Sequence, residues 1–142
     1  MQKKILFGLG LLALVVISIG VLTAAAPAPA ATPHVTFTLV NGLPATMNVE
    51  DKATVVVLID SDQEFNSAQM MPDVYFPGRG VVAVQGGDRA GSGTSATLQI
   101  TFVAKNSTTD LGGAIPVSVV AGARYKGGYT ASQRYDFSVT VP

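Results

Sequence analysis

The stretch SATLQITFVAK, residues 95–105, decides the fold class of this chain. Apolar and polar residues alternate strictly through its middle. The apolar positions are Ala96, Leu98, Ile100 and Phe102. A period of two gives an extended strand one apolar and one wet face, whereas an amphipathic helix repeats every 3.6 residues. The stretch therefore predicts a β-strand that buries one of its faces.

Four further runs have the composition of strands. Val35 to Leu39 alternates in the same way. The run ATVVVLI, residues 53–59, is β-branched and apolar on both faces, which indicates a central strand. Residues 116–125 and 129–141 are joined by Lys126-Gly127-Gly128, which is typical of a tight hairpin turn. These runs extend the prediction of strands over most of the chain after Pro33.

Two weaker strands are expected at Asp73 to Phe76 and at Val81 to Gln85. No long window after Pro33 has a helical period, and glycines and prolines recur between the runs. About six to eight short strands over a single domain are typical of an antiparallel β-sandwich. The sequence therefore predicts an all-β fold for this part of the chain.

The order of the strand-like segments carries a resemblance. ATLQITFVAKN (residues 96–106), GGAIPVSVVAGARYKGGY (112–129) and DFSVTV (136–141) follow one another as a Thr-rich strand, a Gly and Pro turn, an apolar strand, a hairpin and a closing strand. NVEDKATVVVLID (48–60) places acids before an alternating run. The chain thus resembles the immunoglobulin-like modules of prokaryotic cell-surface and exported proteins. The resemblance implies an immunoglobulin-like β-sandwich that acts as a spacer, docking surface or adhesion unit.

The N-terminus is hydrophobic. Residues 5–22 carry no charge and follow Lys3 and Lys4. At about 1.5 Å per residue, a helix over residues 5–26 is roughly 33 Å long, enough to cross a bilayer core of about 30 Å. The next lysine or arginine is Lys52, so the positive-inside bias places the N-terminus in the cytoplasm and the domain outside. We expect a transmembrane anchor or signal peptide at 1–26, an Ala/Pro spacer at 27–33 and an immunoglobulin-like sandwich at 34–142.

Two alternatives stay open for the N-terminal segment. An uncleaved helix over residues 5–26 would tether the domain to the cell membrane as a single-pass protein. Cleavage after Ala25 or Ala30, where small residues fit a signal-peptidase site, would release the domain as a secreted protein. In the released form the sequence ATPHVTFTLV could complete a neighbour's sheet by strand addition, so self-association is expected there.

The composition excludes several classes of function. The chain has no cysteine, which rules out disulfides, thiolate metal sites and a cysteine nucleophile. After Ala30 there are nine acidic residues and, without Lys3 and Lys4, seven of the nine basic ones, so no basic face for nucleic acid is expected. The lone histidine, His34, borders the spacer, and no nucleophile motif is present. We therefore expect no enzyme activity, no catalytic residue and no organic cofactor.

Three carboxylates alternate directly after the apolar run, in the sequence Asp60-Ser61-Asp62-Gln63-Glu64. Oxygen ligands at alternate positions of a loop can bind Ca²⁺, which takes about six to eight oxygens. Asp60, Asp62 and Glu64 are therefore a candidate calcium site. Phe65 stands where an EF-hand loop has glycine, and the alternative is a solvated loop.

Three tyrosines and three cations lie in or near the predicted hairpin. They are Arg124, Tyr125, Lys126, Tyr129, Arg134 and Tyr135. Tyrosine offers contact area with a polar tip, and arginine binds carboxylates through two parallel hydrogen bonds. The cluster is a candidate docking face for a glycan, an anionic polymer or a protein partner in the envelope. The alternative is that the tyrosines pair across strands, as aromatic residues commonly do.

Asn106-Ser107-Thr108 is the only N-x-Ser/Thr sequon, so Asn106 is a candidate glycosylation site. Together, the sequence predicts a non-catalytic, extracytoplasmic module with a structural or interaction role. It would be a small subunit of an envelope complex or a surface docking domain. A glycan-binding or calcium-binding surface domain is the alternative from another class.

Overall fold

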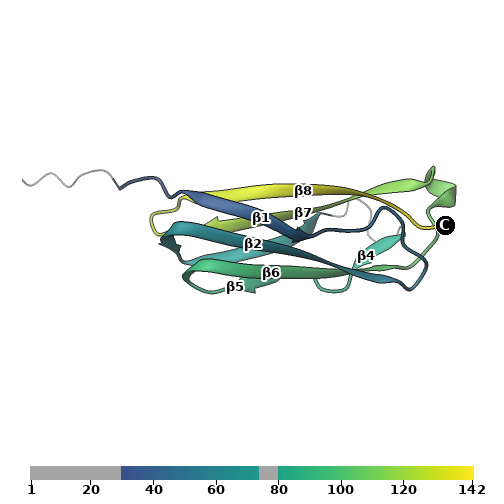
Figure 1. Ribbon diagram of the computed structural model, residues 1–142, viewed down its shortest axis with the longest axis horizontal. Coiled ribbons are helices and arrows are strands. Elements are labelled where there is room, and N and C mark those ends of the chain that lie inside the picture. The colour runs from purple at the N-terminus through teal and green to yellow at the C-terminus, as the bar shows by residue number, and fades with distance from the viewer. Residues whose placement is uncertain (1–29, 74–79) are drawn as a thin grey trace, which may run out of the picture. The chain divides into compact units, whose positions relative to one another are not determined.

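The computed structural model describes residues 30–73 and 80–142. Residues 33–142 form one compact unit of two four-stranded antiparallel sheets (Figure 1). The predicted N-terminal helix and most of the strand expected at Asp73 to Phe76 lie outside the described residues. Within the described ranges, no helix is long and apolar enough to cross a membrane. The prediction of an all-β sandwich is confirmed.

The first sheet contains the stretch that predicted the fold. Its strands, in order across the sheet, are β1 (Val35–Asn41), β2 (Lys52–Phe65), β6 (Gly93–Ala104) and β4 (Val81–Ala83). The alternating apolar residues of β6 are all buried, as a period of two requires. The run ATVVVLI lies in β2, which pairs with β1 on one side and β6 on the other, so the prediction of a central strand is confirmed.

The second sheet faces the first. Its strands, in order, are β5 (Asp88–Ala90), β3 (Ser67–Asp73), β7 (Ala114–Arg124) and β8 (Thr130–Thr140), and a short 3-10 helix, η1 (Thr109–Leu111), precedes β7. The hairpin between β7 and β8 forms as predicted. Within this hairpin, the backbone amide of Tyr125 donates a hydrogen bond to Tyr129 O at 2.9 Å. Gly127 and Gly128 have φ angles of 90° and 92°, which a side chain would strain.

The strand order is that of an immunoglobulin constant domain with one addition. The order β1-β2-β6-β4 corresponds to the four-stranded sheet of such a domain, and β3-β7-β8 corresponds to its three-stranded sheet. The added strand is β5, which pairs with β3. After β3, the chain crosses to the first sheet and forms β4. It then returns to the second sheet to form β5, before it enters β6 in the first sheet.

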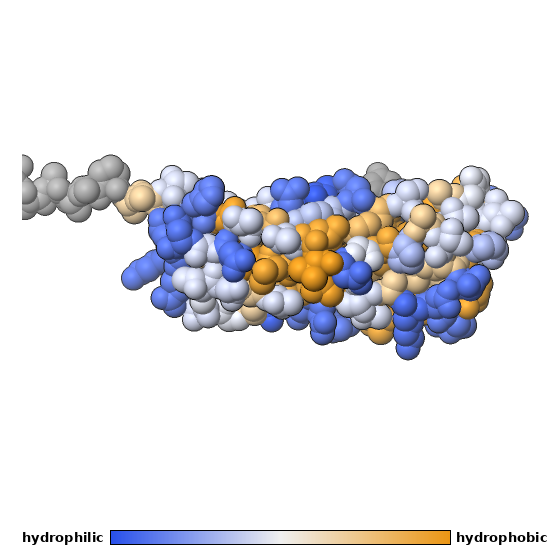
Figure 2. Space-filling model, in the orientation of Figure 1, coloured by the Kyte–Doolittle hydropathy of each residue, from blue (hydrophilic) through white to orange (hydrophobic). Residues whose placement is uncertain are grey.

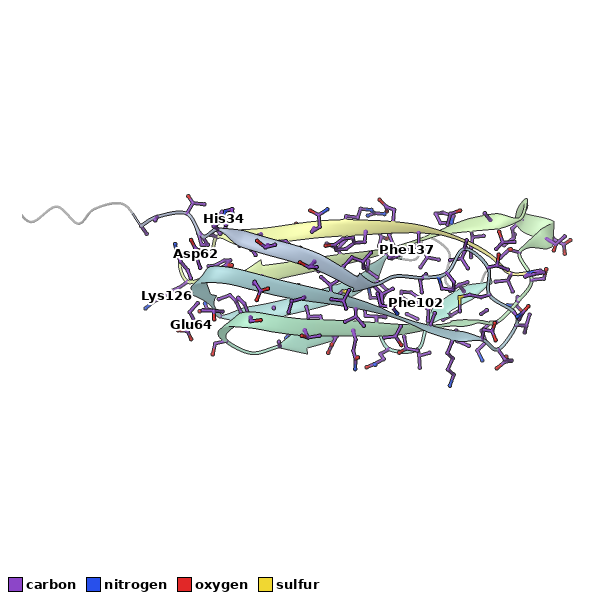
Figure 3. All side chains as sticks on the ribbon, viewed as in Figure 1. His34, Asp62, Glu64, Phe102, Lys126 and Phe137 are labelled. Carbon is purple, nitrogen blue, oxygen red and sulfur yellow. The ribbon has the colours of Figure 1, made fainter. Side chains whose placement is uncertain are left out.

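The core fills the space between the two sheets. Its largest fully buried side chains include Phe65, Phe102, Ile59, Met70 and Leu98, and Figure 3 shows Phe102 in the middle of the domain. Phe137 of β8 is partly buried against this core and lies next to Gly42, just after β1. A Cβ on Gly42 would lie 2.7 Å from Phe137 Cε1, so this contact requires glycine. Among the described residues, no buried side-chain polar atom lacks a hydrogen bond.

The outer face of the first sheet is apolar in its middle. Figure 2 shows this surface over the middle of the domain. Val56 and Leu58 of β2 are half-buried and point away from the core, and Val40 of β1 is 61% exposed. Both faces of β2 are therefore apolar, but only the inner face is fully buried, and the outer face stays partly in contact with solvent.

The C-terminus is fixed from two sides. Thr108 is fully buried, and its Oγ1 accepts a hydrogen bond from Val141 N at 2.9 Å and donates to Gly113 O. On the other side, Thr140 N donates to Ala45 O at 2.9 Å and Met47 N donates to Thr140 O at 3.0 Å. These bonds hold the last strand in place and end its free edge at Thr140.

Candidate functional site

The six residues predicted as one docking face do not form one surface. Tyr125 is only 4% exposed, its ring lies 6.4 Å from that of Phe65, and its hydroxyl donates to Ser61 Oγ at 2.7 Å. Tyr135 is half-buried against the core, whereas its neighbour Arg134 is exposed on the opposite face of β8. The prediction of a single six-residue face is wrong because alternate residues of a strand point to opposite faces.

Three of the predicted residues stay at the surface near the hairpin. Tyr129 is 43% exposed, with its ring 5.7 Å from that of Tyr125. Lys126 is exposed at the end of the domain (Figure 3). Arg124 is exposed at the end of β7, where it pairs with Thr130 of β8 and Ser67 of β3. Of these three, Arg124 lines a groove on the second sheet.

A shallow groove of about 390 Å³ crosses the outer face of the second sheet. It is lined by Ser67, Gln69, Met71, Arg89, Val120, Gly122, Ala123, Arg124, Thr130, Ala131 and Ser132. Gly122 forms its floor, because a Cβ there would lie 3.1 Å from Ala131 O and 3.6 Å from Ser132 Cβ. The absence of a side chain at this one position of β7 leaves the hollow.

Two arginines stand on different sides of the groove. Arg89 of β5 pairs with Gln69, which pairs with Gly122, so Arg89 lies two strand spacings, roughly 10 Å, across the sheet from the floor. Arg124 lies two residues along β7 from Gly122, a separation of about 7 Å. Arg89 Nη2 donates to Gln69 Oε1 at 3.3 Å. Within the described ranges, neither arginine forms an ion pair with a carboxylate.

The sequence did not predict this groove. Arg89 lies in a strand of three residues, which is too short to show a period. Arg89 comes close to β7 only because the chain returns from β4 in the first sheet to β5 in the second. The one signal available was Gly122 in the middle of an otherwise apolar strand, since glycine in a strand often marks a close approach or a gap.

The candidate calcium ligands lie in a strand rather than in a loop. Asp60, Asp62 and Glu64 belong to β2, which continues to Phe65, so the prediction of a loop was wrong. Alternate side chains of a strand share a face but lie about 6.6–7 Å apart, too far for three carboxylates to reach one ion. Asp62 Oδ1 accepts a hydrogen bond from His34 N at 2.8 Å. No group of three or more possible metal ligands occurs in the part of the chain described, and calcium binding stays an untested prediction.

The sequon lies in the loop between β6 and η1. Asn106 is exposed, whereas Thr108 is fully buried and hydrogen-bonded to Val141 and Gly113. An enzyme that needs the whole tripeptide accessible would therefore have to act before this loop folds. Glycosylation of Asn106 stays a prediction.

A network of charges on the outer face of the second sheet surrounds Arg134. Its Nη1 lies 2.6 Å from Asp73 Oδ2, and its Nε lies 2.8 Å from Asp136 Oδ1. Ser118 Oγ donates to Asp136 Oδ1 at 2.6 Å. Hydrogen bonds from Ser118 and Arg134 lower the pKa of Asp136, and bonds to Asp136 and Asp73 raise the pKa of Arg134. Arg134 and Asp136 therefore stay charged across the neutral pH range.

Comparison with known proteins gives only distant likenesses. No protein-family model matches the chain, and no curated protein is similar to it in sequence. The native conformation of alpha-2-macroglobulin from E. coli is similar over 79% of this chain and 7% of its own, with a TM-score of 0.43 and 14% identity. The major pilin subunit of Bacillus cereus (D312A variant) is similar over 78% of this chain and 40% of its own, with a TM-score of 0.39 and 10% identity. The chain spans less than half the length of either protein, and likenesses at this level identify no family.

Proposed function

We propose that this chain is a non-catalytic, extracytoplasmic interaction module whose groove on the second sheet docks an acidic segment of a protein partner in the envelope. The observation that carries the proposal is the pair of arginines, Arg89 and Arg124, beside a hollow over Gly122. Among the described residues neither arginine has a carboxylate partner, so each is available to bind a carboxylate of another molecule through two parallel hydrogen bonds.

The rest of the groove suits a polypeptide. Met71 is 49% exposed and lies next to Val120, so one wall is apolar. Gln69 and Ser132 offer polar groups beside the floor. No aromatic residue lines the groove, although sugars are commonly bound by stacking on aromatic rings. An acidic peptide with an apolar neighbour therefore fits better than a glycan does.

Photo-cross-linking from the groove tests this proposal. Benzoylphenylalanine at Met71 is expected to cross-link the full-length chain to a partner in intact cells, whereas the same group at Thr97 is not. Thr97 is exposed in the middle of β6, on the outer face of the other sheet, so it is a matched control. The combined changes Arg89→Glu and Arg124→Glu should reduce the Met71 product at least about tenfold, because each charge-assisted hydrogen bond is worth about 1.5–3 kcal/mol.

Equal cross-linking from Met71 and Thr97 would show contact without a docking site. A Met71 product that survives both charge reversals would show that the arginines do not bind the partner. Either result overturns the proposal. A Met71 product supports the proposal if the two charge reversals reduce it and if its mass is greater than that of two copies of this chain.

Tethering of the domain to the membrane is a separate part of the proposal. It rests on the uncharged residues 5–22, on Lys3 and Lys4 before them, and on the lack of lysine and arginine from there to Lys52. We expect the intact mass of the native protein in the membrane fraction to be that of the full chain. A mass that begins at Ala26 or Ala31, found in the medium, would replace the tethered module by a secreted one.

A further inference from the structure

Within the described ranges, the outer edge of β8 has no hydrogen-bonded strand over most of its length. β8 pairs with β7 without interruption from Thr130 to Thr140 and is the last strand of its sheet. The N–H and C=O groups of Thr140 point away from β7, because they bond to Met47 and Ala45. Backbone direction alternates along an antiparallel strand, so the groups of every second residue before Thr140 also point outward. These residues are Ser138, Asp136, Arg134, Ser132 and Thr130.

Among the described residues, no strand is hydrogen-bonded to this edge before Thr140, although β1, the edge strand of the other sheet, runs beside β8 (Figure 1), with Pro33 to Phe37 and Tyr129 to Gln133 bordering one open hollow. Within the described part of the chain, Arg134 O accepts a hydrogen bond from the side chain of its neighbour, Gln133 Nε2, at 3.2 Å and from no backbone amide. A free edge of this length is a template for another strand. The side chains at the edge determine which strand can pair there.

Charge selects one partner and one register. Arg134 and Asp136 carry opposite charges two residues apart, and both lie on the outer face of the sheet. If two copies of β8 pair in antiparallel fashion about a twofold axis at Tyr135, Arg134 of each copy lies opposite Asp136 of the other. An axis at Arg134 or at Asp136 would place like charges opposite each other, which destabilises a sheet. An axis at Gln133 or Phe137 would leave both charges opposite uncharged residues.

We propose that two copies of this chain associate through β8, antiparallel, about a twofold axis at Tyr135. The two second sheets then form one continuous eight-stranded sheet. Four residues of each strand, Ser132, Arg134, Asp136 and Ser138, form hydrogen-bonded pairs with the other copy. Each pair exchanges two backbone bonds, about eight bonds for the interface. The pairing ends at Ser138 because residues 45–47 cover Thr140.

Disulfide cross-linking of the full-length chain tests the pairing and reads its register. The natural chain has no cysteine, so every cross-link comes from introduced residues. In the proposed dimer, residue 132 lies opposite residue 138 of the other copy, with Cα atoms about 5.5 Å apart, within reach of a disulfide. The double variant Ser132→Cys/Ser138→Cys is therefore expected to form disulfide-linked dimers in cells under mild oxidation. Both serines are exposed, so the fold should tolerate the changes.

The single variants are the matched controls. In this register, residue 132 lies about 20 Å from residue 132 of the other copy, since six residues of strand separate them, and the same holds for residue 138. Neither Ser132→Cys nor Ser138→Cys alone should give a dimer. Absence of dimer in the double variant overturns the proposal. Dimer in the single variants at the same level also overturns it, because random collision or another register would then explain the product.

Charge reversal tests whether Arg134 and Asp136 determine the pairing of the two β8 strands. In the double-cysteine chain, Arg134→Asp places acids opposite acids, and Asp136→Arg places cations opposite cations, so each is expected to reduce cross-linking severalfold. Co-expression of the two reversed chains restores opposite charges across the interface and is expected to restore the cross-link. Lys52→Asp, an exposed change on the other sheet, should have no effect. If co-expression fails to restore the product, the charges do not specify the pairing and the proposal is wrong.

This inference rests on the edge of β8 and does not depend on the proposed function. The benzoylphenylalanine product from Met71 identifies a second protein by its mass, whereas the cysteine product is twice the mass of this chain. Failure of one experiment therefore leaves the other proposal standing.

Discussion

The Tyr125→Ala variant is expected to unfold with a free energy about 3–5 kcal/mol lower than that of the natural chain, the usual cost of removing a large buried ring. Tyr125 is 4% exposed and its ring lies edge-on to Phe65, at a centroid distance of 6.4 Å. Its hydroxyl also donates to Ser61 Oγ, which ties the start of the hairpin to β2 on the other sheet. Urea unfolding followed by circular dichroism measures the change.

Two variants separate the parts of this effect. Tyr125→Phe keeps the ring and removes the bond to Ser61, so it should lose only about 1 kcal/mol. Tyr129→Ala removes a ring that is 43% exposed, and it should lose about 1 kcal/mol or less. Similar losses for Tyr125→Ala and Tyr129→Ala would contradict the assignment of Tyr125 to the core. Unchanged stability of Tyr125→Ala would return it to the class of surface docking residues.

The regular part of the fold could be predicted from the sequence. The alternation in residues 95–105 places β6, and the β-branched run ATVVVLI places β2 in the centre of its sheet. Lys126-Gly127-Gly128 gives the hairpin, since it provides glycines where the turn needs positive φ. In each case the sequence signal is local, because it arises from the burial pattern of one strand or from the conformation of one turn. Strands of three residues, such as β5, are too short to give such a signal.

The surface could not be predicted in the same way, because sequence neighbours separate when a strand alternates. Arg134 and Tyr135 are adjacent in the chain but lie on opposite faces of β8. Asp60, Asp62 and Glu64 lie on the same face of β2 but do not converge on one position. They are spread along the strand because β2 continues through the polar residues that follow the apolar run. Conversely, Arg89 and Arg124 are 35 positions apart in the numbering and share one groove. The pairing of β3 with both β5 and β7 brings them there.

The two proposed surfaces both belong to the second sheet. Pairing of two copies through β8 would place both grooves on one continuous sheet, on the same outer face. Two tethered docking sites at a fixed separation bind a partner with repeated acidic segments more tightly than either site alone, because the second contact becomes intramolecular. A partner with one acidic segment would gain nothing. Tight binding that is lost together with the β8 pairing would therefore indicate a repetitive partner.

The Thr108→Val variant is expected to lose about 2–4 kcal/mol of stability, although valine has the same shape as threonine. The hydroxyl of Thr108 accepts the amide hydrogen of Val141 at 2.9 Å and donates to the carbonyl of Gly113. Val141 is fully buried, so its amide would have no solvent to replace the lost acceptor. Each buried polar group left without a partner costs about 1–3 kcal/mol.

The Thr108→Ser variant distinguishes the hydroxyl from packing, since it keeps the oxygen and removes only the methyl group. That methyl lies 2.5 Å from the position a Cβ on Gly80 would occupy, so it contributes contacts of its own. We expect Thr108→Ser to lose about 1 kcal/mol, as for one buried methyl group, and clearly less than Thr108→Val. Faster amide exchange at Val141 should accompany the valine change alone, because only that change releases the last strand. If serine proves as damaging as valine, packing of the methyl group fixes the C-terminus and the hydrogen bonds do not.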